Sequence, residues 1–129
     1  MTSDGIRDCD WDQVKDLAAK IANAACRNDQ RFGQVLTRRL FQLLRTLESR
    51  YGPKPSILAT KADYVPSRDA RIRLLKRAWS LALSAEDKPN LTWIAGSLAE
   101  VFIDDLRDRR RGEAWLSRLE RALSCYWDD

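Results

Sequence analysis

Apolar residues recur every three or four positions along most of the chain, and this spacing predicts six amphipathic helices. The second segment is the clearest, because its leucines share one helical face while polar residues lie opposite. Those leucines are Leu36, Leu40, Leu43, Leu44 and Leu47. No stretch of useful length alternates apolar and polar residues, as a half-buried strand would. The pattern therefore predicts an all-α protein.

Four of the other helices show apolar faces of the same kind. The predicted inward positions are Val14, Leu17, Ala18, Ile21 and Ala25 in the first helix, Ile72, Leu75, Ala78, Trp79 and Ala82 in the fourth, Ile94, Leu98, Val101, Phe102 and Leu106 in the fifth, and Trp115, Leu116, Leu119, Ala122, Leu123 and Tyr126 in the sixth. A short third helix fits residues 56–65. Asp10, Ser67 and Asn90 are the predicted N-caps of the first, fourth and fifth helices, since their side chains can accept a backbone N–H.

Length and composition predict how these helices are organised. The chain has 129 residues, 44% of them hydrophobic and 33% charged, which suits one globular domain with a buried core. We expect a single all-helical domain over residues 1–129, with residues 1–9 flexible. About six antiparallel helices can form either stacked helical hairpins or a compact bundle, and the pattern leaves both arrangements open.

An internal repeat favours the hairpins. A shift of 37 positions places the third and fourth helices on the fifth and sixth with their apolar positions in phase. The matched pairs include Ile57 with Ile94, Ala62 with Ala99, Ala78 with Trp115 and Ala82 with Leu119. Through the stretches "ILATKADYV…LLKRAWSLA" and "WIAGSLAEVFI…WLSRLERAL", residues 56–123 resemble tetratricopeptide-type repeats. The usual period is nearer 34, and the glycine and proline of that consensus are not in place.

The resemblance implies a scaffold or adaptor that docks a peptide or protein on the face formed by the first helix of each pair. The exposed positions expected on that face are Lys61, Trp93, Ser97, Glu100 and Asp104. Trp93 lies on the polar side of its helix, and an exposed tryptophan is a typical hot-spot residue.

The residue types argue against catalysis. The chain has no histidine, which removes the commonest general base and metal ligand. Its three cysteines are far apart and form no metal-binding spacing, so we expect buried or idle thiols. Glu100, Asp104 and Asp108 share a helix face without the partners of a metal site, which favours a solvated acidic surface. We therefore predict no enzyme, no metal and no cofactor.

Charge is unevenly distributed along the chain. Residues 27–77 carry thirteen basic and four acidic side chains, a net charge of +9, between two mildly acidic segments. Within this block, Arg38 and Arg45 share one helix face, and Arg73, Lys76 and Arg77 share another. These side chains could contact an anionic partner such as nucleic acid, or they could pair with the acidic helix of the same protein.

The sequence thus predicts a non-catalytic module that binds another protein or peptide, as an adaptor, scaffold or inhibitor. The alternative is a nucleic-acid-binding or regulatory protein that uses the block 27–77. The proposed partner-binding residues are Lys61, Trp93, Ser97, Arg38, Arg45, Arg73, Lys76 and Arg77. No apolar run is long enough for a membrane span and no signal peptide is recognisable, so we expect a cytoplasmic protein without a membrane partner. A homodimer is left open.

Overall fold

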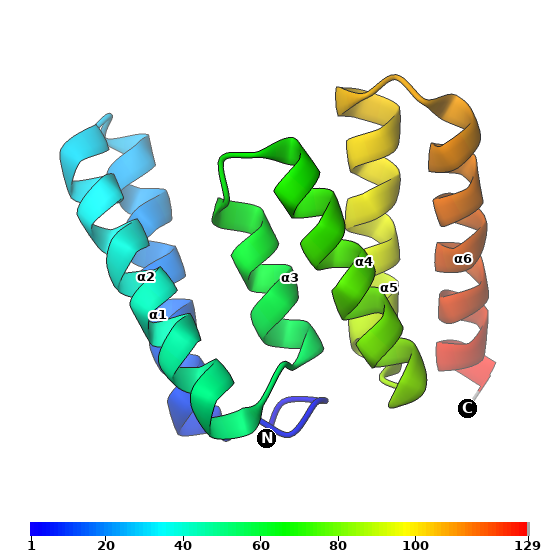
Figure 1. Ribbon diagram of the computed structural model, residues 1–129, viewed down its shortest axis with the longest axis horizontal. Coiled ribbons are helices and arrows are strands. Elements are labelled where there is room, and N and C mark those ends of the chain that lie inside the picture. Colours follow the sequence, from blue (N-terminus) through cyan, green and yellow to red (C-terminus); the bar gives the residue numbers. More distant parts are fainter. Residues whose placement is uncertain (129) are drawn as a thin grey trace. The chain divides into compact units, whose positions relative to one another are not determined.

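Helices account for all the regular structure in the described part of the chain. The computed structural model describes residues 1–128, and side chains for residues 1–124. Its helices pack as sequential antiparallel hairpins, α1 with α2, α3 with α4 and α5 with α6, which confirms the predicted all-α class (Figure 1). The chain divides into two compact units, Met1–Pro53 and Lys54–Asp129. That residues 1–129 form a single domain stays a prediction. Tyr126 and Cys125 lie outside the described side chains.

The first unit is one helical hairpin, formed by α1 (Asp8–Cys26) and α2 (Gln30–Tyr51). The leucine stripe predicted for the second helix is buried at four of its five positions and half-buried at Leu43. Asp29 begins α2, because its carboxylate accepts the backbone N–H of Phe32 at 3.2 Å. Amphipathic spacing and a side-chain cap therefore account for this helix.

Asp10 does not cap the first helix, so this prediction is wrong. Arg7 occupies the N-cap position without a side-chain capping bond. Asp10 lies inside α1 and is buried, and its carboxylate accepts hydrogen bonds from Tyr51 Oη and, at 3.2 Å, from Arg50 Nη1. The hydrogen bond from Tyr51 is the main cause that lowers the pKa of Asp10, and Arg50 adds to it. The aspartate thus ties α1 to the end of α2.

The residues before α1 form a hydrogen-bonded turn. The backbone N–H of Thr2 donates to the carbonyl of Ile6 at 2.8 Å, and the N–H of Ile6 donates to Thr2 Oγ1 at 2.9 Å. Ile6 is fully buried. The flexibility expected for residues 1–9 stays a prediction.

The second unit contains two consecutive hairpins. Its elements are α3 (Pro55–Tyr64), α4 (Arg68–Ser84), α5 (Lys88–Glu100), the π-helical turn η1 (Val101–Asp105) and α6 (Arg109–Asp128). Ser67 caps α4 through the N–H of Ala70 at 3.2 Å, which confirms that prediction. Asp87, not Asn90, caps α5, so the prediction for Asn90 is wrong. Asn90 is buried one turn later and donates from Nδ2 to Ser56 Oγ at 3.2 Å and to Asp87 Oδ2 at 2.6 Å.

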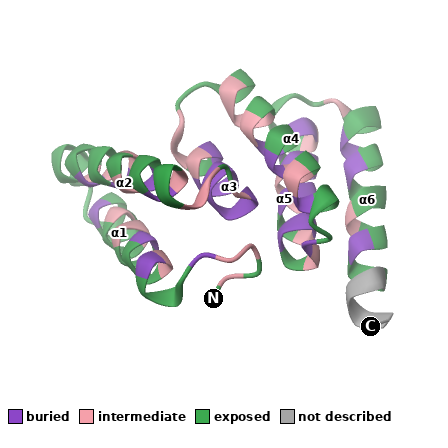
Figure 2. Cartoon of the chain, turned by 60° about the horizontal axis from the view of Figure 1, so that its bottom comes forward, coloured by how far each residue is buried: buried purple, intermediate pink, exposed green. Residues whose placement is uncertain are grey.

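Small residues let the helices of the second unit approach one another closely. Its core includes the alanines Ala59, Ala62, Ala78, Ala82, Ala95, Ala99 and Ala122 among larger side chains such as Leu98, Phe102 and Trp115. Several positions matched by the 37-residue shift are buried in both hairpins, as at Ala62 and Ala99, whereas Leu119, the match of Ala82, is half-buried. Figure 2 shows these buried positions along α3 and α5. The repeat in the sequence therefore coincides with a repeat in burial.

Four residues predicted to face inward are exposed, so these predictions are wrong. Ala25 is exposed and its neighbour Ala24 is buried instead. Leu106 follows η1, whose wider turn shifts the residues after it off the helical face predicted from regular spacing. Leu116 and Leu123 lie on α6, which packs against α5 and η1 and leaves its outer side uncovered by described residues.

The two cysteines whose side chains the structure describes are not in the core. Cys9 and Cys26 lie on α1 as exposed, unbonded thiols, so they are not the buried thiols expected. Whether they are idle stays a prediction.

Candidate functional site

The residues predicted to bind a partner on the first helix of each pair lie on α3 and α5. Trp93 keeps 46% of its surface exposed, as its place on the polar side of α5 predicted. Ser97 follows it by one helical turn and is half-buried, and Glu100 lies a further turn along and is exposed. Lys61 is half-buried on α3. The face of α5 therefore combines an exposed aromatic ring with polar groups.

A polar cleft of about 290 Å³ lies between α3, α4, α5 and η1. Its walls are Asp63 from α3, Arg71 and Leu75 from α4, Ser97 and Glu100 from α5, and Val101 and Asp105 from η1. Of the positions predicted on this face, Ser97 and Glu100 line the cleft itself, and Trp93 lies one helical turn before Ser97. Side chains of both hairpins of the second unit, most of them polar, thus form the walls of the cleft.

Negative charge predominates in this polar cleft. Its walls carry three carboxylates and one guanidinium group. Arg71 is held in place because its Nε donates to the carbonyl of Ala62 at 3.0 Å. Partial desolvation raises the pKa of Asp63 although the residue is exposed, the Glu100 carboxylate raises the pKa further, and Arg71 opposes the rise. Burial together with the Asp63 charge also raises the pKa of Tyr64. A positive charge close to Asp63 would favour the ionised form of its carboxyl group.

In the part of the chain that the structure describes, no three His, Cys, Asp or Glu side chains are arranged to hold a metal ion. Two further acidic residues follow Glu100 in the sequence. Asp104 is exposed to solvent, and the Asp108 carboxylate accepts the backbone N–H of Arg111 at 3.2 Å at the start of α6.

The cations predicted on α4 do not line the cleft. Arg73 and Arg77 are exposed and, at 100° per residue, lie on the side of α4 turned away from Arg71. Lys76 is exposed too, with its Nζ 5.8 Å from the centre of the Phe102 ring. None of these three cations forms an ion pair with a described carboxylate. The pairing with the acidic helix considered from the sequence is therefore absent among the described residues.

Arg38 and Arg45 belong to the first unit, where both are exposed on α2. Their spacing of two helical turns places them on one face, as predicted. Neither forms an ion pair with a described carboxylate.

Sequence reasoning missed Asp63 and Arg71. The repeat contains a signal for Asp63, because the same shift of 37 positions that matches the apolar residues places Asp63 on Glu100. Applying the repeat to polar positions would have predicted two carboxylates at equivalent places of adjacent hairpins. Arg71 has no such signal, since its counterpart is Asp108.

Comparisons with known proteins add no relative: no family model, no curated protein and no solved structure matches the chain. Among the described helices, none combines the length and the apolar content that a membrane crossing requires.

Proposed function

We propose that this protein is a non-catalytic interaction module, built from tetratricopeptide-like hairpins, that binds a basic segment of another protein in the polar cleft. The observation that carries the proposal is the acidic cleft between two hairpins, which is continuous along α5 with the exposed ring of Trp93. Lysine or arginine side chains of a partner would pair with Asp63 and Glu100, while an apolar side chain would contact Trp93. No reaction and no cofactor are part of the proposal.

Charge complementarity determines the choice of partner. The cleft carries three carboxylates and one guanidinium group. This excess of negative charge would repel an acidic peptide and attract a basic one. The raised pKa of Asp63 agrees with this choice, because desolvation and the Glu100 carboxylate raise it in spite of the nearby Arg71.

The test is a fluorescence-anisotropy titration with two labelled probes, a lysine- and leucine-containing peptide and its glutamate counterpart. We expect the basic probe alone to bind, and Asp63→Asn with Glu100→Gln to weaken its binding by about tenfold. Glu120→Gln is the control, since it removes one exposed carboxylate that does not line the cleft. Equal weakening by the control, or equal binding of both probes, would refute the assignment of the cleft.

Trp93 is tested separately. Trp93→Ala should keep the helical content and lower the thermal unfolding temperature only slightly, because nearly half of the residue is already in solvent. It should weaken binding of the basic probe by about tenfold if the ring is a hot spot. Binding equal to that of the unaltered protein would remove Trp93 from the site.

A second candidate function uses the α4 cations to bind nucleic acid or another anionic partner. The observation in its favour is that Arg73, Lys76 and Arg77 have no carboxylate partner among the described residues. Retention on a generic DNA duplex at 50 mM salt, lost by about 200 mM and weakened by Arg73→Ala with Arg77→Ala, would support it. Absence of retention at 50 mM salt would eliminate this candidate.

A further inference from the structure

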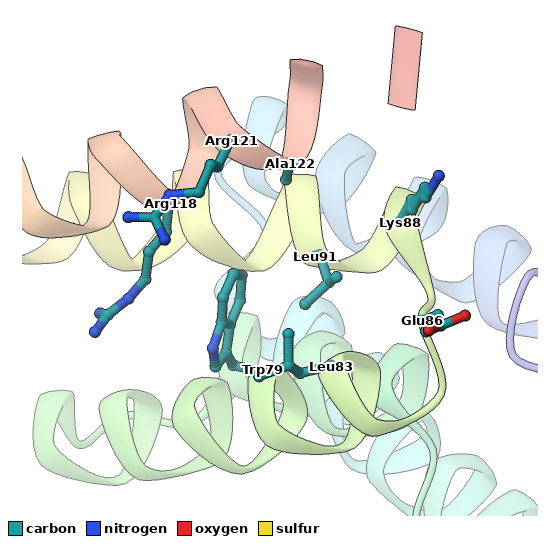
Figure 3. A pocket seen from close by; sticks show the side chains of 8 residues that line it. All are labelled: Trp79, Leu83, Glu86, Lys88, Leu91, Arg118, Arg121 and Ala122. Atoms are coloured by element: carbon teal, nitrogen blue, oxygen red, sulfur yellow. The ribbon is translucent and has the colours of Figure 1, made fainter. Parts of the chain in front are cut away.

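An apolar cavity of about 420 Å³ opens between α4, α5 and α6, and it shares no residue with the polar cleft. Figure 3 shows Trp79 and Leu83 projecting from α4 toward Leu91 on α5. Arg118, Arg121 and Ala122 of α6 line the other side, and Glu86 and Lys88 lie where α4 connects to α5. This volume is in the range of cavities that bind small molecules.

The wall of the cavity is apolar and held by aromatic packing. The rings of Trp79 and Trp115 meet edge to face with their centres 5.2 Å apart, which fixes the Trp79 indole beside the opening. Leu83 exposes 56% of its surface although it lines the cavity. An exposed leucine beside an ordered tryptophan gives an apolar ligand a surface to cover.

The rim of the cavity is basic on one side. The guanidinium of Arg118 lies 4.2 Å from the centre of the Trp115 ring, a cation–π contact that orients it without neutralising it. Arg118 and Arg121 extend from α6 on the same side of Trp79, and neither pairs with a described carboxylate (Figure 3). Glu86 is the one carboxylate among the lining residues, and it lies at the opposite end, where α4 joins α5.

We propose that this cavity binds a small amphipathic carboxylate of the fatty-acid type. The hydrocarbon part would lie against Trp79, Leu83 and Leu91, and the carboxylate would receive hydrogen bonds from Arg118 and Arg121. Both guanidinium groups line the cavity, and each suits a carboxylate because it presents its donors in a planar fork. The apolar wall supplies the contact area, and the basic rim selects the anion over a neutral molecule of the same shape.

The test is an NMR titration of the full chain with octanoate, with octan-1-ol as the neutral probe of equal chain length. We expect one octanoate per chain with a Kd of about 1 mM or below, and shifts concentrated at the Trp79 indole N–H and the facing turns of α4, α5 and α6. Octan-1-ol should bind at least fivefold more weakly. Equal binding of the two probes, or shifts away from the cavity, would overturn the proposal.

Two variants separate ligand contact from loss of folding. Arg118→Gln with Arg121→Gln should weaken octanoate at least fivefold and leave octan-1-ol unchanged. Leu83→Glu changes a largely exposed side chain, so it should fold normally and weaken both probes. Arg110→Gln is the matched control, since it removes an exposed arginine of the same helix outside the cavity. Weakening by the control equal to that of the double variant, or unchanged octanoate binding in Leu83→Glu, would also overturn the proposal.

Discussion

The contact between Gly112 and Ile103 provides a sharp test of the packing in the second unit. Gly112 lies in the first turns of α6 and is buried against η1. A Cβ atom at this position would lie 2.2 Å from Cγ1 of Ile103, 3.0 Å from its Cδ1 and 3.4 Å from its backbone nitrogen. The helix therefore approaches η1 as closely as it does because position 112 has no side chain. We predict that Gly112→Ala destabilises the second unit.

Gly96 supplies the reference for the magnitude. A Cβ atom there would have Leu119 Cδ2 as its nearest neighbour, at 3.9 Å, which is an ordinary van der Waals distance. Gly96→Ala should therefore stabilise α5 by about 0.5–1 kcal/mol, the usual gain of alanine over glycine inside a helix. At position 112 the same gain is opposed by an overpacking cost of about 1–3 kcal/mol. Ile103 cannot avoid the clash cheaply, since its branched Cβ restricts rotation about χ1.

The assay is urea unfolding in a Trp11→Phe background followed by tryptophan fluorescence, so that the remaining tryptophans all belong to the second unit. Gly112→Ala should be less stable than Gly96→Ala by about 1–3 kcal/mol, with unchanged helical content. Combining Gly112→Ala with Ile103→Ala removes the clashing atoms, so the two substitutions should show a coupling energy of about 1 kcal/mol or more. If Gly112→Ala raises the urea midpoint as Gly96→Ala does, the close approach of α6 to η1 is wrong.

Three further predictions concern polar contacts. The pKa of Asp10 is lowered in the folded protein, so the ionised carboxylate contributes its full stability above the ordinary aspartate pKa of 3.8. This stability is lost as the pH falls through the pKa of the folded protein. Asp10→Asn should therefore remove this part of the acid unfolding followed by circular dichroism. The pKa of Asp63 is raised, so anisotropy titrations should show the basic probe binding more weakly on acidification, beginning above the ordinary aspartate value, and Asp63→Asn should shift that dependence. Asn90→Ala should cost about 1–3 kcal/mol in urea unfolding because it breaks buried hydrogen bonds, whereas Asn23→Ala, at an exposed site of α1, should cost far less.

The sequence predicted the helices well because their apolar spacing was regular. The stripe from Leu36 to Leu47 needs one buried side and one solvated side, and only a helix of that length provides both. Ser67 was predictable as a cap because it follows the helix-breaking Pro66 and directly precedes the apolar spacing of α4. Where local signals agreed, the element and its boundary followed from them.

Residues whose role depends on a distant partner could not be predicted in this way. Aspartate is a residue type that often caps helices, but the hydrogen-bond partners of Asp10, Arg50 and Tyr51, lie 40 and 41 residues away in the sequence. Asn90 was predicted as the cap of α5, but Asp87 caps that helix and the Asn90 side chain donates to Ser56, 34 residues away. Spacing shows which side of a helix can be buried, but the neighbouring element decides whether it is.

The same limit applies to exposed apolar positions. Leu116 and Leu123 carry the spacing of a buried stripe, yet among the described residues no further element covers that side of α6. Leu106 lost its predicted place because η1 changes the number of residues per turn, and no residue type in the segment signals a π-helical turn. A repeat in the sequence therefore predicts the packing within and between its units more securely than the packing at its end.

The basic block 27–77 shows why charge along a sequence is not charge on a surface. Arg71 and Arg68 of this block are bonded to backbone carbonyls of Ala62 and Asp105, whereas Arg73 and Arg77 point to the other side of α4. The contribution of the block to the polar cleft thus includes one of its four acidic residues, Asp63, and the cleft is acidic although its walls come partly from the most basic segment. The net charge of +4 would therefore attract an acidic partner, whereas the cleft would select a basic one. Titrations with basic and acidic probes at two salt concentrations distinguish them, because each responds to a different set of substitutions.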